Sequence, residues 1–107
     1  MSTLTNGFNA AVHQEEDTAV IKLNGVINNT ADPALEDAYQ KAEALAAPRI
    51  TLDFTAVEYI NSTGIALIVS LLAHARAHKT PITAVGLTDH YREIFTITRL
   101  SDFMDIQ

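Results

Sequence analysis

The apolar and polar positions of the chain change their spacing several times, and each change predicts a new element. Residues 8–13, more weakly, and residues 19–23 have the short, β-branched pattern of strands. Residues 50–54 alternate between apolar and polar side chains, which is the two-residue period of a half-buried strand. Residues 82–85 and 103–106 predict two further short strands.

Three segments have helical features. Asp32 and Pro33 predict a helix start, because an aspartate can accept hydrogen bonds from free amides and proline tolerates the first helical position. Apolar residues then recur at helical spacing. A second helix is expected to begin at Ser62, and a third after a cap at Thr88 or Asp89.

The predicted order is β-β-α-β-α-β-α-β. Strands that alternate with helices indicate an α/β fold with a mostly parallel sheet. The opening pair of strands predicts a hairpin, which makes the sheet mixed, with about four to five strands packed against helices. The chain has 107 residues, of which 48% are hydrophobic, so we expect a single domain over residues 1–107.

Composition and charge exclude several classes of function. The net charge is −6, and seven lysines and arginines are scattered along the chain, which disfavours direct binding of nucleic acids or anionic membranes. The longest apolar run, residues 65–69, is too short to insert into a membrane, and residues 1–11 lack the pattern of a signal peptide. There is no cysteine. We therefore expect a cytoplasmic protein.

Residues 52–66 are the segment that carries candidate chemistry. A strand leads to small polar residues and then to an apolar helix, so Ser62 or Asn61 is suited to cap the helix N-terminus. Such an end also tolerates a phosphoryl group, because it carries a partial positive charge and unpaired N–H groups. From spacing alone, a serine at this place is more often a simple cap than a modification site.

The same segment resembles the signature of STAS-domain anti-sigma-factor antagonists, in which a strand leads to Asp-Ser-(Ser/Thr)-Gly and an apolar helix. The matching residues are Asn61, Ser62, Thr63 and Gly64. The resemblance implies the STAS fold and phosphorylation at Ser62 rather than at Thr63. Residues 23–28 and the segment from Ile94 to Leu100 are also similar to the family.

The resemblance further implies a role in partner switching. The unphosphorylated form is expected to bind an anti-sigma factor that is also a Ser/Thr kinase of the histidine-kinase-like ATPase type. Phosphorylation would release it, and a metal-dependent Ser/Thr phosphatase would reset it. The expected partner-binding residues are Asn28, Thr30, Asn61, Ser62, Thr63, Gly64, Ile65 and Leu67. Asn28 and Asn61 depart from the family, which usually has Asp at both positions.

A helical projection of the second helix separates a core face from a polar face. The expected core residues are Ile65, Ile68, Val69, Leu72 and Ala75. Leu67 falls on the polar side with Ser70, His74 and His78, where it would suit a partner contact or simply be one exposed leucine.

Rival functions have less support. His74 and His78 stand four residues apart, but no third ligand follows, so surface histidines are favoured over a metal site. Ser62 lacks the Gly-x-Ser-x-Gly frame of a catalytic nucleophile, and there is no glycine-rich phosphate loop. We therefore expect no catalytic residue, no cofactor and no enzyme activity. The alternative is a STAS subunit or scaffold that holds a constant partner in a transporter or signalling complex, without phosphorylation.

Overall fold

The computed structural model describes residues 7–107, so the first six positions of the expected domain and of the N-terminal segment lie outside the described residues. Its strands are β1 (Phe8–Glu15), β2 (Thr18–Ile27), β3 (Arg49–Ile60), β4 (Ile82–Val85) and β5 (Asp105–Ile106). Its helices are α1 (Asp32–Ala44), α2 (Ser62–Ala77) and α3 (Asp89–Ile97), and its 3-10 turns are η1 (Asn29–Ala31) and η2 (Leu100–Asp102).

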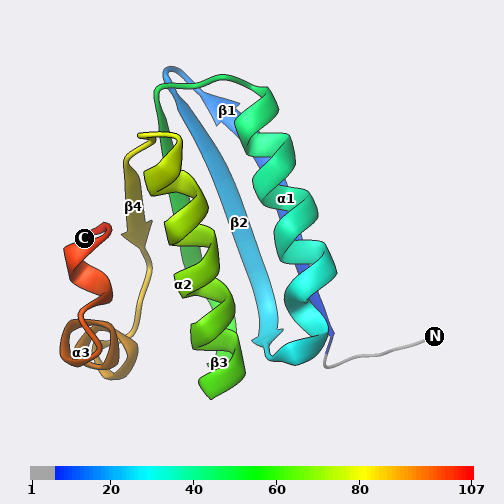
Figure 1. The fold of residues 1–107 in the computed structure, drawn as a ribbon. Helices are drawn as coiled ribbons and strands as arrows, with labels where there is room; N and C mark the ends of the chain where they lie inside the picture. The colour runs from blue at the N-terminus through cyan, green and yellow to red at the C-terminus, as the bar shows by residue number, and fades with distance from the viewer. Residues whose placement is uncertain (1–6) are drawn as a thin grey trace.

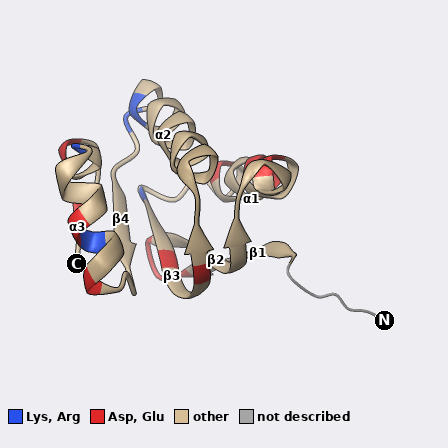
Figure 2. Cartoon of the chain, turned by 90° about the horizontal axis from the view of Figure 1, so that it is seen from below, with Lys and Arg blue, Asp and Glu red and all other residues tan. Residues whose placement is uncertain are grey.

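The five strands form one mixed sheet in the order β1-β2-β3-β4-β5. β1 and β2 are an antiparallel hairpin, and the remaining neighbours are parallel. Helices α1 and α2 lie side by side on one face of the sheet, whereas α3 lies beyond β4 (Figures 1 and 2). The structure confirms the predicted α/β class and the mostly parallel sheet.

The strand register explains why one face of the sheet is apolar. Val12, Ile21, Leu52 and Ala84 are successive partners across β1 to β4 and face the helices, together with the rest of the core. A shift of one residue along each strand turns the side chains to the other face. The two helices therefore bury the apolar rows and leave the opposite rows uncovered.

Asp53 lies on the uncovered face of the sheet. Partial burial acts to raise the pKa of the Asp53 carboxyl, but hydrogen bonds from Thr55 N and Thr55 Oγ1, at 2.9 and 2.6 Å, outweigh this effect. The charge of nearby Lys22 acts in the same direction as the hydrogen bonds. The pKa of Asp53 is therefore lowered. Its carboxylate binds the backbone and side chain of Thr55, two residues further along β3.

Two strands are longer than the sequence pattern predicts. β2 continues to Ile27, because register irregularities and Gly25, at φ +99°, let the chain bend and stay paired with β3. β3 continues to Ile60, past the alternating segment that ends at residue 54. The expected connection before α2 is therefore mostly strand, held by its pairing with β2.

Three local predictions are wrong in detail. Asp32 does not cap α1: Ala31 occupies the cap without a side-chain hydrogen bond, because η1 leads directly into the helix. The last strand is only Asp105–Ile106, since the chain before it forms η2. Val69, expected in the core, is 44% exposed, and Leu71 is buried instead. Leu71 faces α1, because α1 packs against that side of α2. Of the two caps expected for α3, Thr88 and Asp89, the structure has Thr88.

No helix within residues 7–107 is long and apolar enough to span a membrane.

We expect replacement of Phe95 by alanine to destabilise the fold far more than replacement of Phe103. Phe95 is fully buried and meets the Phe54 ring edge to face at 5.7 Å, so its loss leaves a cavity worth about 3–5 kcal/mol. Phe103 is 47% exposed beneath the Arg76 guanidinium, and its loss should lower the free energy of unfolding by about 1 kcal/mol or less. Urea unfolding of both variants measures the difference, and equal losses would contradict the described core.

Candidate functional site

The site begins at the carboxyl ends of β2 and β3, which lie side by side. β2 leads into η1, and β3 leads into α2. The Asn61 backbone N–H donates to the Ile27 carbonyl oxygen at 3.2 Å, which ties the two strand ends together. In open α/β sheets, ligands bind outside the carboxyl ends of the strands, where loops and helix starts take no part in the hydrogen bonding between strands.

Asn61 is the cap of α2. Its backbone is extended, and its Oδ1 accepts a hydrogen bond from the Gly64 N–H at 2.7 Å. The sequence left open whether Asn61 or Ser62 takes this role, and the structure assigns it to Asn61. Ser62 is consequently the first residue of the helix rather than its cap.

Gly64 lets α2 approach β2 more closely than another residue would. It is buried, and a Cβ built on it would lie closer than 3.0 Å to the Ile27 carbonyl oxygen, a distance that real Cβ atoms essentially never show. The first turn of α2 therefore rests on the backbone of β2. This explains in physical terms why a glycine closes the Asn61–Gly64 segment.

Asn28 performs a similar cap at the end of β2. Its Oδ1 accepts from the Thr30 N–H at 2.9 Å and from the Thr30 hydroxyl at 2.6 Å, and it caps η1. The turn η1 contacts α2, which places Asn28 and Thr30 beside the helix start. Asn28 and Asn61 thus both act as hydrogen-bond acceptors, a role that the aspartates expected from the family resemblance would also fill.

Ser62 and Thr63 are exposed on the first turn of α2. Among residues 7–107, neither hydroxyl has a hydrogen-bond partner, and the first turn of the helix contains no acidic residue. The unpaired N–H groups and partial positive charge of this turn favour an anion nearby. A phosphoryl group on Ser62 would therefore meet an accommodating helix end.

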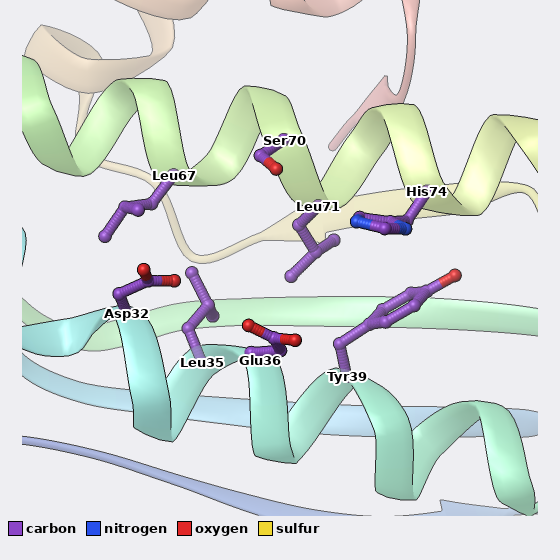
Figure 3. Close-up of a pocket in the computed structure, with 8 residues that line it drawn as sticks. All are labelled: Asp32, Leu35, Glu36, Tyr39, Leu67, Ser70, Leu71 and His74. Atoms are coloured by element: carbon purple, nitrogen blue, oxygen red, sulfur yellow. The ribbon is translucent and has the colours of Figure 1, made fainter.

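Ile65 and Leu67 extend the site along α2, and both are half-buried. Figure 3 shows Leu67 directed toward Asp32 and Leu35 of α1. The expectation of an outward-facing Leu67 is therefore wrong, because the helical projection does not include the neighbouring helix. Seven of the eight predicted positions gather at the strand ends, and Leu67 lies further along the helix; their roles in partner binding remain predictions.

Tyr91 supports the site and was not predicted from the sequence. Its hydroxyl oxygen accepts a hydrogen bond from the Ile60 N–H at 2.9 Å, so α3 holds the last residue of β3. The two residues are 31 positions apart, and no local pattern signals their contact.

His74 of α2 and His78, the residue that caps the C-terminus of α2, both contact side chains of α1. His78 Nδ1 lies 3.4 Å from Glu43 Oε2, and the His74 ring lies 6.1 Å from that of Tyr39. Burial, together with the hydrogen bond and charge of Glu43, raises the pKa of Tyr39 to about 12, which keeps its hydroxyl a donor. Within the described part of the chain, no group of three or more His, Cys, Asp or Glu side chains is arranged to hold a metal.

Comparison with known families defines the class of protein. Residues 10–106 match the family model described as "Mlab, STAS domain", which covers most of the chain. The protein belongs to this STAS-domain family, as its signature segment predicts.

Individual relatives show which proteins of known sequence or structure the chain resembles. The chain is 28% identical over 96 residues to the anti-sigma-B factor antagonist of Listeria monocytogenes, covering 88% of this chain and 84% of that protein. Its fold is similar to that of an anti-sigma factor antagonist from Mycobacterium paratuberculosis, with a TM-score of 0.77 and 20% identity, over 98% of this chain and 89% of that one. Unphosphorylated SpoIIAA has a TM-score of 0.69 at 17% identity, over 94% and 87% of the two chains.

We expect Gly64→Ala to destabilise the protein, although alanine is ordinarily the better helix former by about 1 kcal/mol. The added methyl group would push α2 away from the Ile27 carbonyl oxygen, so the free energy of unfolding should fall by about 2 kcal/mol or more. Thr63→Ala, at the exposed neighbouring position, is the matched control and should change it by less than about 0.5 kcal/mol. A Gly64→Ala protein as stable as the wild type would argue against the close approach.

Asn61 should be replaceable by aspartate but not by alanine. Asn61→Ala removes the acceptor for the Gly64 N–H and should lower the free energy of unfolding by about 1 kcal/mol. Asn61→Asp keeps the acceptor and adds a negative charge at the helix N-terminus, so its stability should equal or slightly exceed that of the wild type. Chemical denaturation of the two variants checks this, and equal losses would mean that the side chain does not cap α2.

Proposed function

We propose that this protein is an anti-sigma-factor antagonist that works as a binding module. Its unphosphorylated form binds an anti-sigma factor that is also a Ser/Thr kinase of the histidine-kinase-like ATPase type. The observation that carries this proposal is the exposed hydroxyl of Ser62 on the first turn of α2, at the position of the family's phosphorylated serine. This hydroxyl has no hydrogen-bond partner within the described residues 7–107.

The switch follows from the chemistry of that hydroxyl. The kinase, using ATP and magnesium, would transfer the γ-phosphoryl group to Ser62 Oγ, releasing ADP and the hydroxyl proton. The product carries about −1.5 to −2 charge, which the helix N-terminus accommodates. The fold therefore persists, while the partner meets a bulky dianion where a hydroxyl had been. A metal-dependent phosphatase would hydrolyse the ester and restore binding.

The relatives support this proposal. The two Listeria proteins are anti-sigma-B factor antagonists by name, and the similarity spans most of both chains. SpoIIAA is described in unphosphorylated and phosphorylated forms, which resemble this chain with TM-scores of 0.69 and 0.68. Both forms therefore share the fold of this chain, so the same fold is compatible with either state of a phosphorylation switch. The proposed address is the cytoplasm, where such a kinase and its sigma factor would be found.

Asn28 and Asn61 alter the electrostatics of the switch rather than its framework. Each keeps its cap through Oδ1 but lacks the charge of the family's aspartate. Two fewer negative charges beside Ser62 ease the arrival of a phosphoryl group and remove two contacts for a basic or magnesium-bearing partner surface.

The alternative is a STAS subunit or scaffold with a constant partner in a transporter or signalling complex. The matching family model, "Mlab, STAS domain", and the two uncharged caps favour keeping this candidate. A pull-down discriminates the two: a sigma-regulating kinase supports the switch, whereas a transporter ATPase supports the constant subunit.

We expect incubation with the anti-sigma kinase of the same genome and ATP to place one phosphate on Ser62, as read by mass spectrometry. Ser62→Ala should abolish the modification, whereas Thr63→Ala, which removes the neighbouring exposed hydroxyl, should leave it intact. Ser62→Asp should weaken kinase binding at least about tenfold, by imitating the negative charge.

The switch would be refuted by an unmodified Ser62 after this incubation, or by a Ser62→Asp protein that binds the kinase as tightly as the wild type. Circular dichroism of each variant establishes that the fold is kept.

A further inference from the structure

A small cleft runs between α1 and α2, which we call the α1–α2 cleft. Its lining residues are Asp32, Leu35, Glu36, Tyr39, Leu67, Ser70, Leu71 and His74 (Figure 3). It encloses about 50 Å³, which is room for about three water molecules or for the methylene groups of one side chain.

The base of the cleft is apolar. Leu35 and Leu71 are 3% and 6% exposed and belong to the core, while Leu67 is half-buried and flanks the opening. Such a surface favours a hydrocarbon stem over a small hydrated ion. The cleft is too small for an entire helix, so its occupant is a single side chain of a larger partner.

The charge on the rim of the cleft is negative and uncompensated. Asp32 and Glu36 line it from α1, and none of the lining residues is a lysine or arginine. Among residues 7–107, no lysine or arginine forms an ion pair with either carboxylate. Glu36 accepts a long 3.4 Å hydrogen bond from Gln40. The cleft therefore combines an apolar base with a rim that complements a cation.

The other two carboxylates of α1 are already engaged. Asp37 pairs with Lys41 at 3.0 Å. Glu43 accepts from the Tyr39 hydroxyl at 3.0 Å and lies 3.4 Å from His78. Within residues 7–107, the carboxylates of α1 that form no ion pair are thus the two that line the cleft.

Helix stability alone explains only one of these two residues. A carboxylate in the first turn, such as Asp32, is favoured by the helix dipole. Glu36 stands four residues later on the same side of the helix, where two like charges repel each other. A cation placed between them would relieve that repulsion.

We infer that the α1–α2 cleft receives one lysine or arginine side chain of the anti-sigma factor. Its stem would lie against Leu35 and Leu67, and its charged head would meet Asp32 and Glu36. This inference rests on the proposed function, because it names a contact of the same partner. α1 and α2 begin at the same end of the molecule (Figure 1), and Leu67 lies about 8 Å along the helix from Ser62. One partner can therefore reach both features.

The cleft and Ser62 have separate tasks in this arrangement. A phosphoryl group on Ser62 adds negative charge near the cleft, which strengthens the attraction of a cation rather than weakening it. Release must then come from the contact at Ser62 itself. The cleft contributes affinity, and Ser62 decides whether the complex forms.

The experiment is to titrate the anti-sigma kinase with Asp32→Asn, Glu36→Gln and the matched control Asp37→Asn at low and moderate salt. All three variants lose one negative charge from the same helix, but Asp37 does not line the cleft. We expect the two cleft variants to raise the Kd about three- to tenfold and to reduce its dependence on salt. The control should stay within about twofold of the wild type, since an exposed charge away from the contact has little effect.

Equal weakening by all three variants would assign the effect to net charge and overturn the inference, as would unchanged binding by both cleft variants. Either result leaves the proposed function intact if the wild-type protein binds and Ser62→Asp does not. A wild-type protein that fails to bind the kinase would instead refute the proposed function, and this contact with it. Thermal melts of the variants verify that each one folds.

Discussion

The contact between Gly64 and the Ile27 carbonyl oxygen is the constraint on which the site depends. Only a residue without a Cβ lets the first turn of α2 rest on the end of β2. The Asn61 N–H bonds the same carbonyl oxygen, so the end of β3 and the start of α2 are fastened to β2 together. Because the backbone makes these contacts, the exposed side chains of the turn are free to take part in binding.

Capping and the proposed switching involve different residues as a result. Asn61 satisfies the Gly64 N–H, whereas among residues 7–107 the Ser62 hydroxyl makes no hydrogen bond that its modification would break. An asparagine serves at this position as well as an aspartate would, since capping requires an acceptor rather than a charge. Asn28 caps η1 at the end of β2 in the same way, because its Oδ1 accepts a hydrogen bond from the Thr30 N–H.

The arrangement of the helices sets the charge around the switch. α1 and α2 each cross back over the sheet before a parallel strand, so both begin at the edge that carries Ser62 (Figure 1). α2 contains no carboxylate, whereas α1 contributes Asp32 and Glu36 beside the apolar cleft. The surface thus joins a helix end that favours anions to a rim that favours cations, and both lie toward the end of the molecule where α1 and α2 begin (Figure 1).

The sequence by itself determined the order of the elements, the mixed sheet and the segment of the proposed switch, because these follow from local spacing and from residues adjacent in the chain. Only the tertiary structure decided the rest. It extended β3 to Ile60 through pairing with β2 and turned Leu67 and Leu71 toward α1. It also brought the Tyr91 hydroxyl to Ile60. A helical or strand period describes one element alone, whereas burial and long-range hydrogen bonds depend on which neighbour that element meets.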